Sequence, residues 1–190
     1  MIFVRKGEKM IGEFASCCFT GYRPEKFPFP LVRGNKDYDD FENRLFEQVL
    51  ELANEGCRTF YCGMAMGFDL IAAEAVLLVK KAFPEHLKVI SVLPFKGQDY
   101  GFSPEWKERF KNVMTHADEM ICLSEKYHTG CYQERNIYMV DNSDYVITWF
   151  DGKKGGTQNT IRYALKKGRQ VFNIYENPQS IGVQTEFLIY

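Results

Sequence analysis

The chain has 190 residues and a formal net charge of −1, with 45% hydrophobic and 26% charged residues, the balance of an ordinary globular protein. This near-neutral charge excludes a global field that would draw the protein to nucleic acids or anionic membranes. No apolar run reaches the roughly 18 residues that a membrane-spanning helix needs. We expect a single cytoplasmic domain over residues 1–190, with its core at about residues 15–175 and no membrane partner.

Short apolar runs alternate with helical patterns along the chain. In order, we predict a strand over 15–20, a Pro-rich loop over 22–36, a helix through 41–50 that stops near 56, a strand over 58–62, a helix over 69–82, a strand over 87–93, a helix over 103–116, a strand over 119–123, a helix over 132–142, a strand over 145–150, a helix over 157–167 and a strand over 170–175. Continuously apolar strands indicate burial on both faces. The fold class is therefore α/β, doubly wound, with a mostly parallel sheet and helices on both faces.

The two ends of the chain and its cysteines carry less information. Residues 1–14 lack the apolar core of a signal peptide and read as a short leader or an extra edge strand, and the tail 176–190 could add a short strand. The six cysteines suit a reducing compartment, where a buried thiol acts as a small hydrophobe. His128 and Cys131 form an isolated H-x-x-C with no second ligand pair, so we expect no metal and no certain cofactor.

Glycine-rich loops follow the first two predicted strands. Gly21 allows a sharp turn after the first strand, and Arg23 can present a bidentate donor to a phosphate, although a plain turn with a solvated Arg fits too. After the second strand, Gly63 and Gly67 would let backbone N–H groups face an anion at a helix N-terminus. Asp69 either caps that helix or binds a ribose hydroxyl, and a tight structural turn remains the alternative.

Two further segments lie before and after the fifth predicted strand. Gly155 and Gly156, with Lys153 and Lys154 before them, suit a phosphate, and Thr157 would cap the next helix; a flexible turn with solvated lysines is the alternative. The Gly-Lys-Ser/Thr order of a P-loop is absent. The run 132–136 combines Glu134, Arg135 and Asn136, which on charge pattern alone favours a solvated helix face.

These motifs, taken together, resemble a known superfamily. The run 63–69 with the Gly155-Gly156-Thr157 loop is similar to the superfamily that joins DprA-type and LOG-type proteins (SLOG), and most of all to its YpsA-like branch, over about residues 16–175. The resemblance implies a Rossmann-like fold and a nucleotide-type ligand, such as ADP-ribose or a dinucleotide. It also leaves a homo-oligomer open, since members of the superfamily often dimerise.

LOG-type enzymes cleave a nucleoside monophosphate to a base and a ribose phosphate. Glu134 and Arg135 match their E-R pair, and Gly156-Thr157 matches their G-T, but Thr160 stands where they carry a glutamate. Hydrolysis of an N-glycosidic bond needs a carboxylate near the sugar, which threonine cannot supply. Whether the chain is an enzyme thus stays open. The two catalytic candidates are Glu74, as a substitute carboxylate, and Arg135, as a residue that binds the phosphate.

The DprA comparison concerns single-stranded DNA. The run 63–69 is similar to the S-G-x-A-x-G-I-D loop of DprA, and Tyr22-Arg23 stands where that family has a G-S-R turn. Because the chain is not basic, we expect no nucleic-acid partner and rank DNA binding behind the enzyme. We favour a sensor or regulatory module that binds a small phosphate-bearing ligand through Gly21, Arg23, Gly63, Gly67, Asp69, Arg135, Gly155, Gly156 and Thr157.

Overall fold

The computed structural model describes residues 14–175; residues 1–13 and 176–190, and with them the expected leader, edge strand and tail strand, lie outside the described residues. The strands are β1 (Ala15–Thr20), β2 (Cys57–Cys62), β3 (Lys88–Leu93), β4 (Glu119–Cys122), β5 (Tyr145–Thr148) and β6 (Gln170–Asn173). The helices are a short 3-10 turn, η1 (Pro24–Lys26), and α1 (Lys36–Asn54), α2 (Phe68–Lys80), α3 (Pro104–His116), α4 (Cys131–Asp141) and α5 (Gly156–Lys166).

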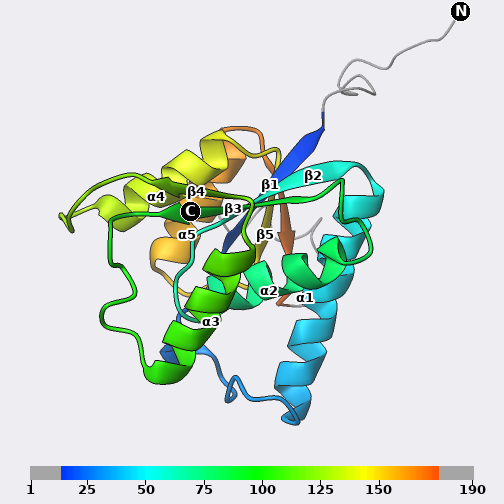
Figure 1. The fold of residues 1–190 in the computed structure, drawn as a ribbon, viewed down its shortest axis with the longest axis horizontal. Coiled ribbons are helices and arrows are strands. Elements are labelled where there is room, and N and C mark those ends of the chain that lie inside the picture. Colours follow the sequence, from blue (N-terminus) through cyan, green and yellow to red (C-terminus); the bar gives the residue numbers. More distant parts are fainter. Residues whose placement is uncertain (1–13, 176–190) are drawn as a thin grey trace, which may run out of the picture.

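The strands form one sheet in the order β4-β3-β2-β1-β5-β6. Every strand pairing among the described residues is parallel. Helices α1, α2 and α3 pack side by side on one face, while α4 and α5 pack together on the other (Figure 1). The α/β, doubly wound, Rossmann-like fold predicted from the sequence is confirmed.

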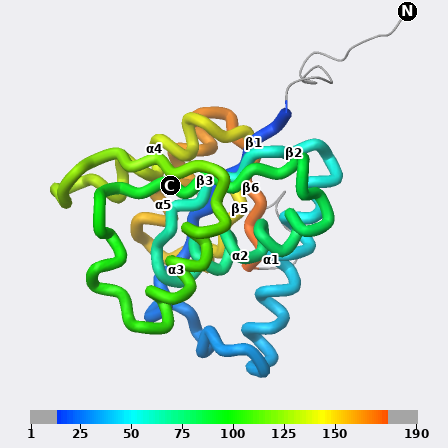
Figure 2. Tube along the Cα trace, viewed as in Figure 1, coloured from blue at the N-terminus to red at the C-terminus, as the bar shows by residue number. Residues whose placement is uncertain are grey.

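The path of the chain creates a switch point in the sheet. It winds outward from β1 to β4, and α4 then carries it back across the sheet to β5, which pairs with β1 (Figure 2). The connections after β1 and after β5 therefore leave toward opposite faces. In open parallel sheets, the crevice outside the carboxyl ends of two such strands is where ligands bind.

Helix and strand ends follow local hydrogen bonds that the sequence pattern does not show. Helix α1 begins at Lys36, because the Asn35 side chain accepts the N–H of Tyr38 at 3.2 Å. Strand β5 ends at Thr148, two residues earlier than predicted, and the Asn173 side chain then holds both backbone groups of Phe150. Among the described residues, no helix combines the length and apolar character needed to cross a membrane.

Aromatic side chains fill the core between the sheet and the α1–α2 layer. Phe27, from the Pro-rich loop, stacks on Trp149 with ring centroids 4.6 Å apart and meets Phe41 of α1 at 5.4 Å. Phe41 is fully buried and also packs against Phe68 of α2 at 6.0 Å. The long loop predicted over 22–36 is therefore anchored by its own aromatic residues, and this anchoring positions the η1 turn beside the carboxyl end of β1.

Removing the Phe41 ring tests this anchoring. Phe41→Ala leaves a cavity among rings that cannot collapse around it, so we expect the free energy of unfolding to fall by about 3–5 kcal/mol. Chemical denaturation followed by circular dichroism measures the loss. Phe14, which is 74% exposed, offers a matched control, and Phe14→Ala should stay within about 0.5 kcal/mol of the wild type. Equal losses in both variants would contradict the packing described.

Candidate functional site

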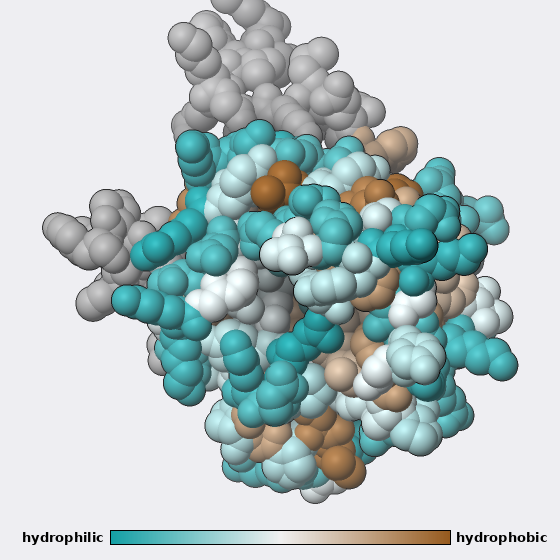
Figure 3. Space-filling view, turned by 90° about the vertical axis from the view of Figure 1, so that its left-hand side faces the viewer, coloured by the Kyte–Doolittle hydropathy of each residue, from teal (hydrophilic) through white to brown (hydrophobic). Residues whose placement is uncertain are grey.

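The loops after β1, β2 and β5 are hydrogen-bonded to one another at the carboxyl edge of the sheet. The Thr157 hydroxyl of α5 donates to the Gly21 carbonyl at 3.0 Å, and the Phe68 N–H of α2 donates to the Tyr22 carbonyl at 3.0 Å. The β1–α1 loop is thus held from both sides. Figure 3 faces the end of the molecule where the loops after β3 and β4 lie, and polar and charged residues cover most of it.

Two of the predicted glycines are required by this packing between loops. A Cβ on Gly21 would lie 2.3 Å from a ring carbon of Phe68. Gly67, the N-cap of α2, has a φ of +88°, and a Cβ there would lie 2.5 Å from the Tyr22 carbonyl oxygen. Both glycines let α2 approach the β1–α1 loop closely, whatever ligand the crevice takes. Their contact with a ligand stays a prediction.

A buried ion pair joins the two helical layers at this edge. Arg135 of α4 and Asp69 of α2 expose only 4% and 8% of their side chains, and Arg135 Nη1 lies 3.0 Å from Asp69 Oδ2. The same Nη1 donates to the Gly63 carbonyl. A Cβ on Gly63 would lie 1.7 Å from this Nη1 atom. Gly67, and not Asp69, is the N-cap of α2, and a contact of Asp69 with a ribose stays a prediction. The Nε of Arg135 is buried without a hydrogen-bond partner among the described residues.

The charges around this pair leave an excess of cations. Burial lowers the pKa of Arg135, Asp69 opposes this, and the neighbouring Arg23 lowers that pKa further. Within residues 14–175, neither Arg23 nor Lys26 has an ion-pair partner. The Lys26 ammonium lies 5.9 Å from the Tyr22 ring centroid and 3.6 Å from the place a Cβ on Gly155 would take. Two cations thus lie at the carboxyl edge of the sheet.

The β5–α5 loop is tied to Tyr22. The Tyr22 hydroxyl donates to the Asp151 carboxylate, which also pairs with Lys153 Nζ at 2.7 Å. Burial, aided by this hydrogen bond, raises the pKa of Tyr22 to about 12. Burial opposes ionisation of Asp151, but the hydrogen bonds from Lys153 and Tyr22 hold the pKa of its carboxyl below the usual range. Lys153 is consequently already engaged by a carboxylate.

The N-terminus of α5 is open. The sequence suggested Thr157 as its N-cap, but the N-cap is Gly155. The Thr157 hydroxyl donates instead to the Gly21 carbonyl. No side chain caps the helix, and a Cβ on Gly156 would meet nothing within 4 Å. The first N–H groups of α5 therefore have no protein partner among the described residues, and Lys26 lies beside them.

The residues that match the LOG pattern separate in space. Arg135 points inward, whereas Glu134 is exposed and lies 3.5 Å from His128. The Thr160 hydroxyl donates to the Gly156 carbonyl at 2.9 Å and accepts from Asn136 at 2.9 Å, joining α5 to α4. In the part of the chain that the structure describes, no group of three or more His, Cys, Asp or Glu side chains is arranged to hold a metal ion.

Glu74 lies apart from the other candidate residues. It is held by Arg109 of α3, whose Nε lies 2.9 Å from its carboxylate. Both line a groove of about 1200 Å³ between α1, α2 and α3, together with Tyr38, whose hydroxyl donates to Glu42. Glu74 and Arg109 are both half-buried and form an ion pair with each other. The hypothesis that Glu74 serves a sugar at the glycine loops has no support in this arrangement.

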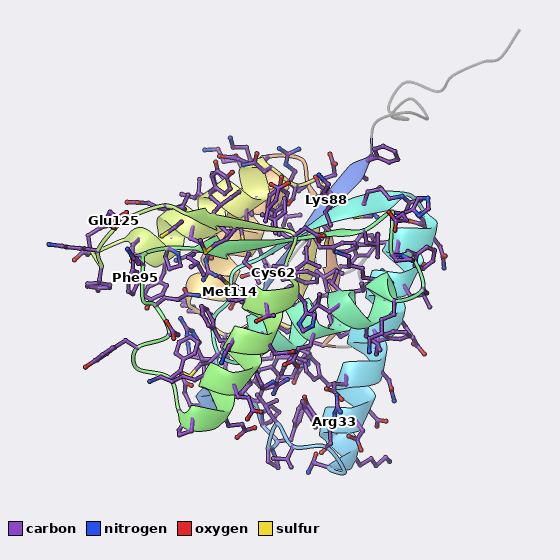
Figure 4. All side chains as sticks on the ribbon, viewed as in Figure 1. Arg33, Cys62, Lys88, Phe95, Met114 and Glu125 are labelled. Carbon is purple, nitrogen blue, oxygen red and sulfur yellow. The ribbon has the colours of Figure 1, made fainter. Side chains whose placement is uncertain are left out.

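Sequence reasoning missed a cluster of three aromatic side chains, Phe95, Tyr127 and Tyr132, which we call the aromatic triad. Their ring centroids lie 5.5 to 6.4 Å apart. Phe95 follows β3, Tyr127 follows β4 and Tyr132 begins α4, and Figure 4 shows Phe95 at the same end of the molecule as Glu125. The Arg23 guanidinium lies 5.5 Å from the Tyr132 ring centroid. The sequence signal that could have revealed the triad is the presence of aromatic residues in otherwise polar loops after the predicted strands.

Comparison with known proteins identifies relatives of the chain. The family model YpsA, described as the YspA SLOG family, matches residues 17–189. An uncharacterized SPbeta prophage-derived protein, YoqJ of Bacillus subtilis, is 32% identical over 149 residues, which is 70% of this chain and 86% of that protein. The UPF0398 protein YpsA of the same organism is 24% identical over 153 residues, covering 80% of this chain and 84% of the relative.

Solved structures of DNA processing protein A share the fold. The protein from Streptococcus pneumoniae superposes with a TM-score of 0.59 at 19% identity, over 91% of this chain and 56% of that chain. The protein from Helicobacter pylori, described for its single-stranded DNA binding mode, gives 0.59 at 20% identity, over 91% of this chain and 73% of its own. The present chain thus spans little more than half of the streptococcal protein.

The buried ion pair predicts a severe effect for one added methyl group. Gly63→Ala would drive a Cβ into Arg135 and Asp69, so the pair must separate inside the protein, and we expect a loss of about 3–5 kcal/mol in the free energy of unfolding. Gly101, where a Cβ would meet nothing within 4 Å, gives a matched control. Thermal and urea unfolding of both variants measures the difference. Wild-type stability in Gly63→Ala would refute the assigned packing.

Proposed function

Because the chain belongs to the YpsA family of SLOG proteins, we propose that it binds the phosphate of a nucleotide or nucleotide derivative in the crevice at the carboxyl ends of β1 and β5. One observation carries the proposal: the N-terminus of α5 lies at the switch point without a side-chain cap, and the Lys26 ammonium beside it has no ion-pair partner within residues 14–175. Free N–H groups and the helix dipole attract an anion there.

The cations around the crevice suit a ligand with more than one negative charge. Lys26 and Arg23 belong to one turn, closed by the Lys26 N–H donating to the Arg23 carbonyl at 3.0 Å. One turn therefore presents an ammonium beside α5 and a guanidinium beside α4. A guanidinium can bind two phosphate oxygens at once. The buried Arg135 adds a further positive charge near Arg23, and its salt bridge to Asp69 holds it in place.

Binding is favoured over hydrolysis because the nearby carboxylates are engaged. Asp69 is paired with Arg135, and Asp151 accepts from Tyr22 and Lys153. A carboxylate held by cations and donors is a weak base, so neither is prepared to activate water. The Thr160 hydroxyl is also fully used in joining α4 to α5. We therefore propose a ligand-binding module with a sensing or regulatory role, and not an N-glycosidase.

Because the fold is similar to that of DNA processing protein A, single-stranded DNA is the alternative ligand to be tested. The formal charge of −1 provides no general attraction to a polyanion, and Arg23 and Lys26 belong to one short turn at the carboxyl edge of the sheet. A mononucleotide-sized ligand fits that distribution better than a strand. We do not propose a nucleic-acid ligand, and a single-stranded oligonucleotide is included in the binding tests as the alternative.

Titration calorimetry with ADP-ribose, at low and moderate salt, tests the proposal. We expect saturable binding, and Lys26→Ala should weaken it about tenfold or more, since it removes a charge-assisted hydrogen bond to phosphate. Lys107, whose ammonium lies 6.0 Å from the Tyr100 ring centroid, is a control matched to Lys26 and Tyr22. Lys107→Ala should leave the affinity unchanged.

Thermal shift supplies an independent readout. At a hundred times its Kd, a ligand should raise the free energy of unfolding by about 2.7 kcal/mol. The proposal fails if no nucleotide or sugar phosphate stabilises the protein. It fails equally if a single-stranded oligonucleotide binds at low salt while ADP-ribose and mononucleotides do not.

A further inference from the structure

We infer that the aromatic triad of Phe95, Tyr127 and Tyr132 is the surface on which the base of the bound nucleotide stacks, and that this base is a purine. The inference rests on the proposed phosphate site at α5 and assigns the other end of the ligand. Three aromatic side chains from three separate segments converge at the same edge of the sheet.

Two of the three rings in the triad are exposed, and the third, Phe95, is half-buried. Tyr127 is 63% exposed and Tyr132 is 38% exposed, while Phe95 packs between them at 5.5 and 5.9 Å. The two loops that carry Phe95 and Tyr127 are joined by the Lys96 N–H, which donates to the Ser124 carbonyl at 3.0 Å. The rings are thus gathered by a fixed backbone contact and left open to solvent, as a stacking surface must be.

The η1 turn connects the triad to the phosphate site. Its first end places the Arg23 guanidinium 5.5 Å from the Tyr132 ring centroid, and its other end places Lys26 beside Gly155. A ligand whose phosphate meets α5 and Lys26 would pass Arg23 before reaching Tyr132. The order of groups along the crevice is therefore phosphate, then sugar, then base. Arg23 can contact both the phosphate and the π face of the base.

The chemistry of the triad favours stacking over base-specific hydrogen bonds. Tyr127 and Tyr132 take part in ring contacts, and within the described residues no hydrogen bond orients either hydroxyl for base recognition. Stacking depends on ring area, because every base has a π face. A purine offers more area than a pyrimidine, so affinity should follow the order purine, pyrimidine, no base.

The decisive comparison is between AMP and ribose 5-phosphate, which differ only by the base. We expect wild-type protein to bind AMP about tenfold more tightly than ribose 5-phosphate, with CMP between them. Tyr127→Ala should remove most of this advantage and change the affinity for ribose 5-phosphate by less than about twofold, since Tyr127 contacts neither Arg23 nor Lys26 in the structure. Tyr127→Phe keeps the ring and should behave like the wild type.

A matched control separates the triad from exposed tyrosines in general. Tyr100 is 89% exposed and lies outside the triad, so Tyr100→Ala should bind AMP as the wild type does. If AMP and ribose 5-phosphate bind wild-type protein equally, the base-stacking inference is overturned while the phosphate site stands. If neither binds, the proposed function and this inference fall together. A Tyr127→Ala variant that keeps the full AMP advantage also overturns the inference.

Discussion

Arg135 carries a positive charge into the interior, and much of the carboxyl edge of the sheet is arranged around it. A buried guanidinium is tolerable only when paired and hydrogen-bonded, and here Asp69 and the Gly63 carbonyl supply the partners. Arg135 belongs to α4 on one face of the sheet and Asp69 to α2 on the other. The pair therefore fastens the two helical layers across the end of the sheet. Residue 63 must be glycine because the guanidinium occupies the space of a side chain.

The same edge shows how binding groups and structural groups share a small space. Tyr22 donates its hydroxyl to Asp151 and its carbonyl accepts from Phe68, so the β1–α1 loop is bonded to both of its neighbours. These bonds do not use the side chains of Arg23 and Lys26 or the first N–H groups of α5. Loops that are already hydrogen-bonded to one another lose little freedom when a ligand binds, which favours tight binding at the proposed site.

Local pattern predicted the elements well because the central strands are short and largely apolar and the helices between them have an apolar face, although β4 is mostly exposed. The roles of side chains in the loops were harder to foresee. Thr157 had every local mark of an N-cap, but a carbonyl 136 residues away, at Gly21, takes its hydroxyl. Glu134 and Arg135 are adjacent in sequence, yet they point to opposite environments. The aromatic triad joins Phe95, Tyr127 and Tyr132, which come together only because β3 and β4 are neighbours.

Thr160 shows how the architecture limits chemical change. Its side chain is 1% exposed and spans the gap between α4 and α5 through Asn136 and the Gly156 carbonyl. A carboxylate in its place would lose water and would face the Gly156 carbonyl, which offers no donor, so Asn136 would be its one donor among these contacts. Burial would raise its pKa and favour the neutral acid over the base that hydrolysis needs. A single substitution at residue 160 would therefore change the contact between α4 and α5 together with the chemistry of the proposed site.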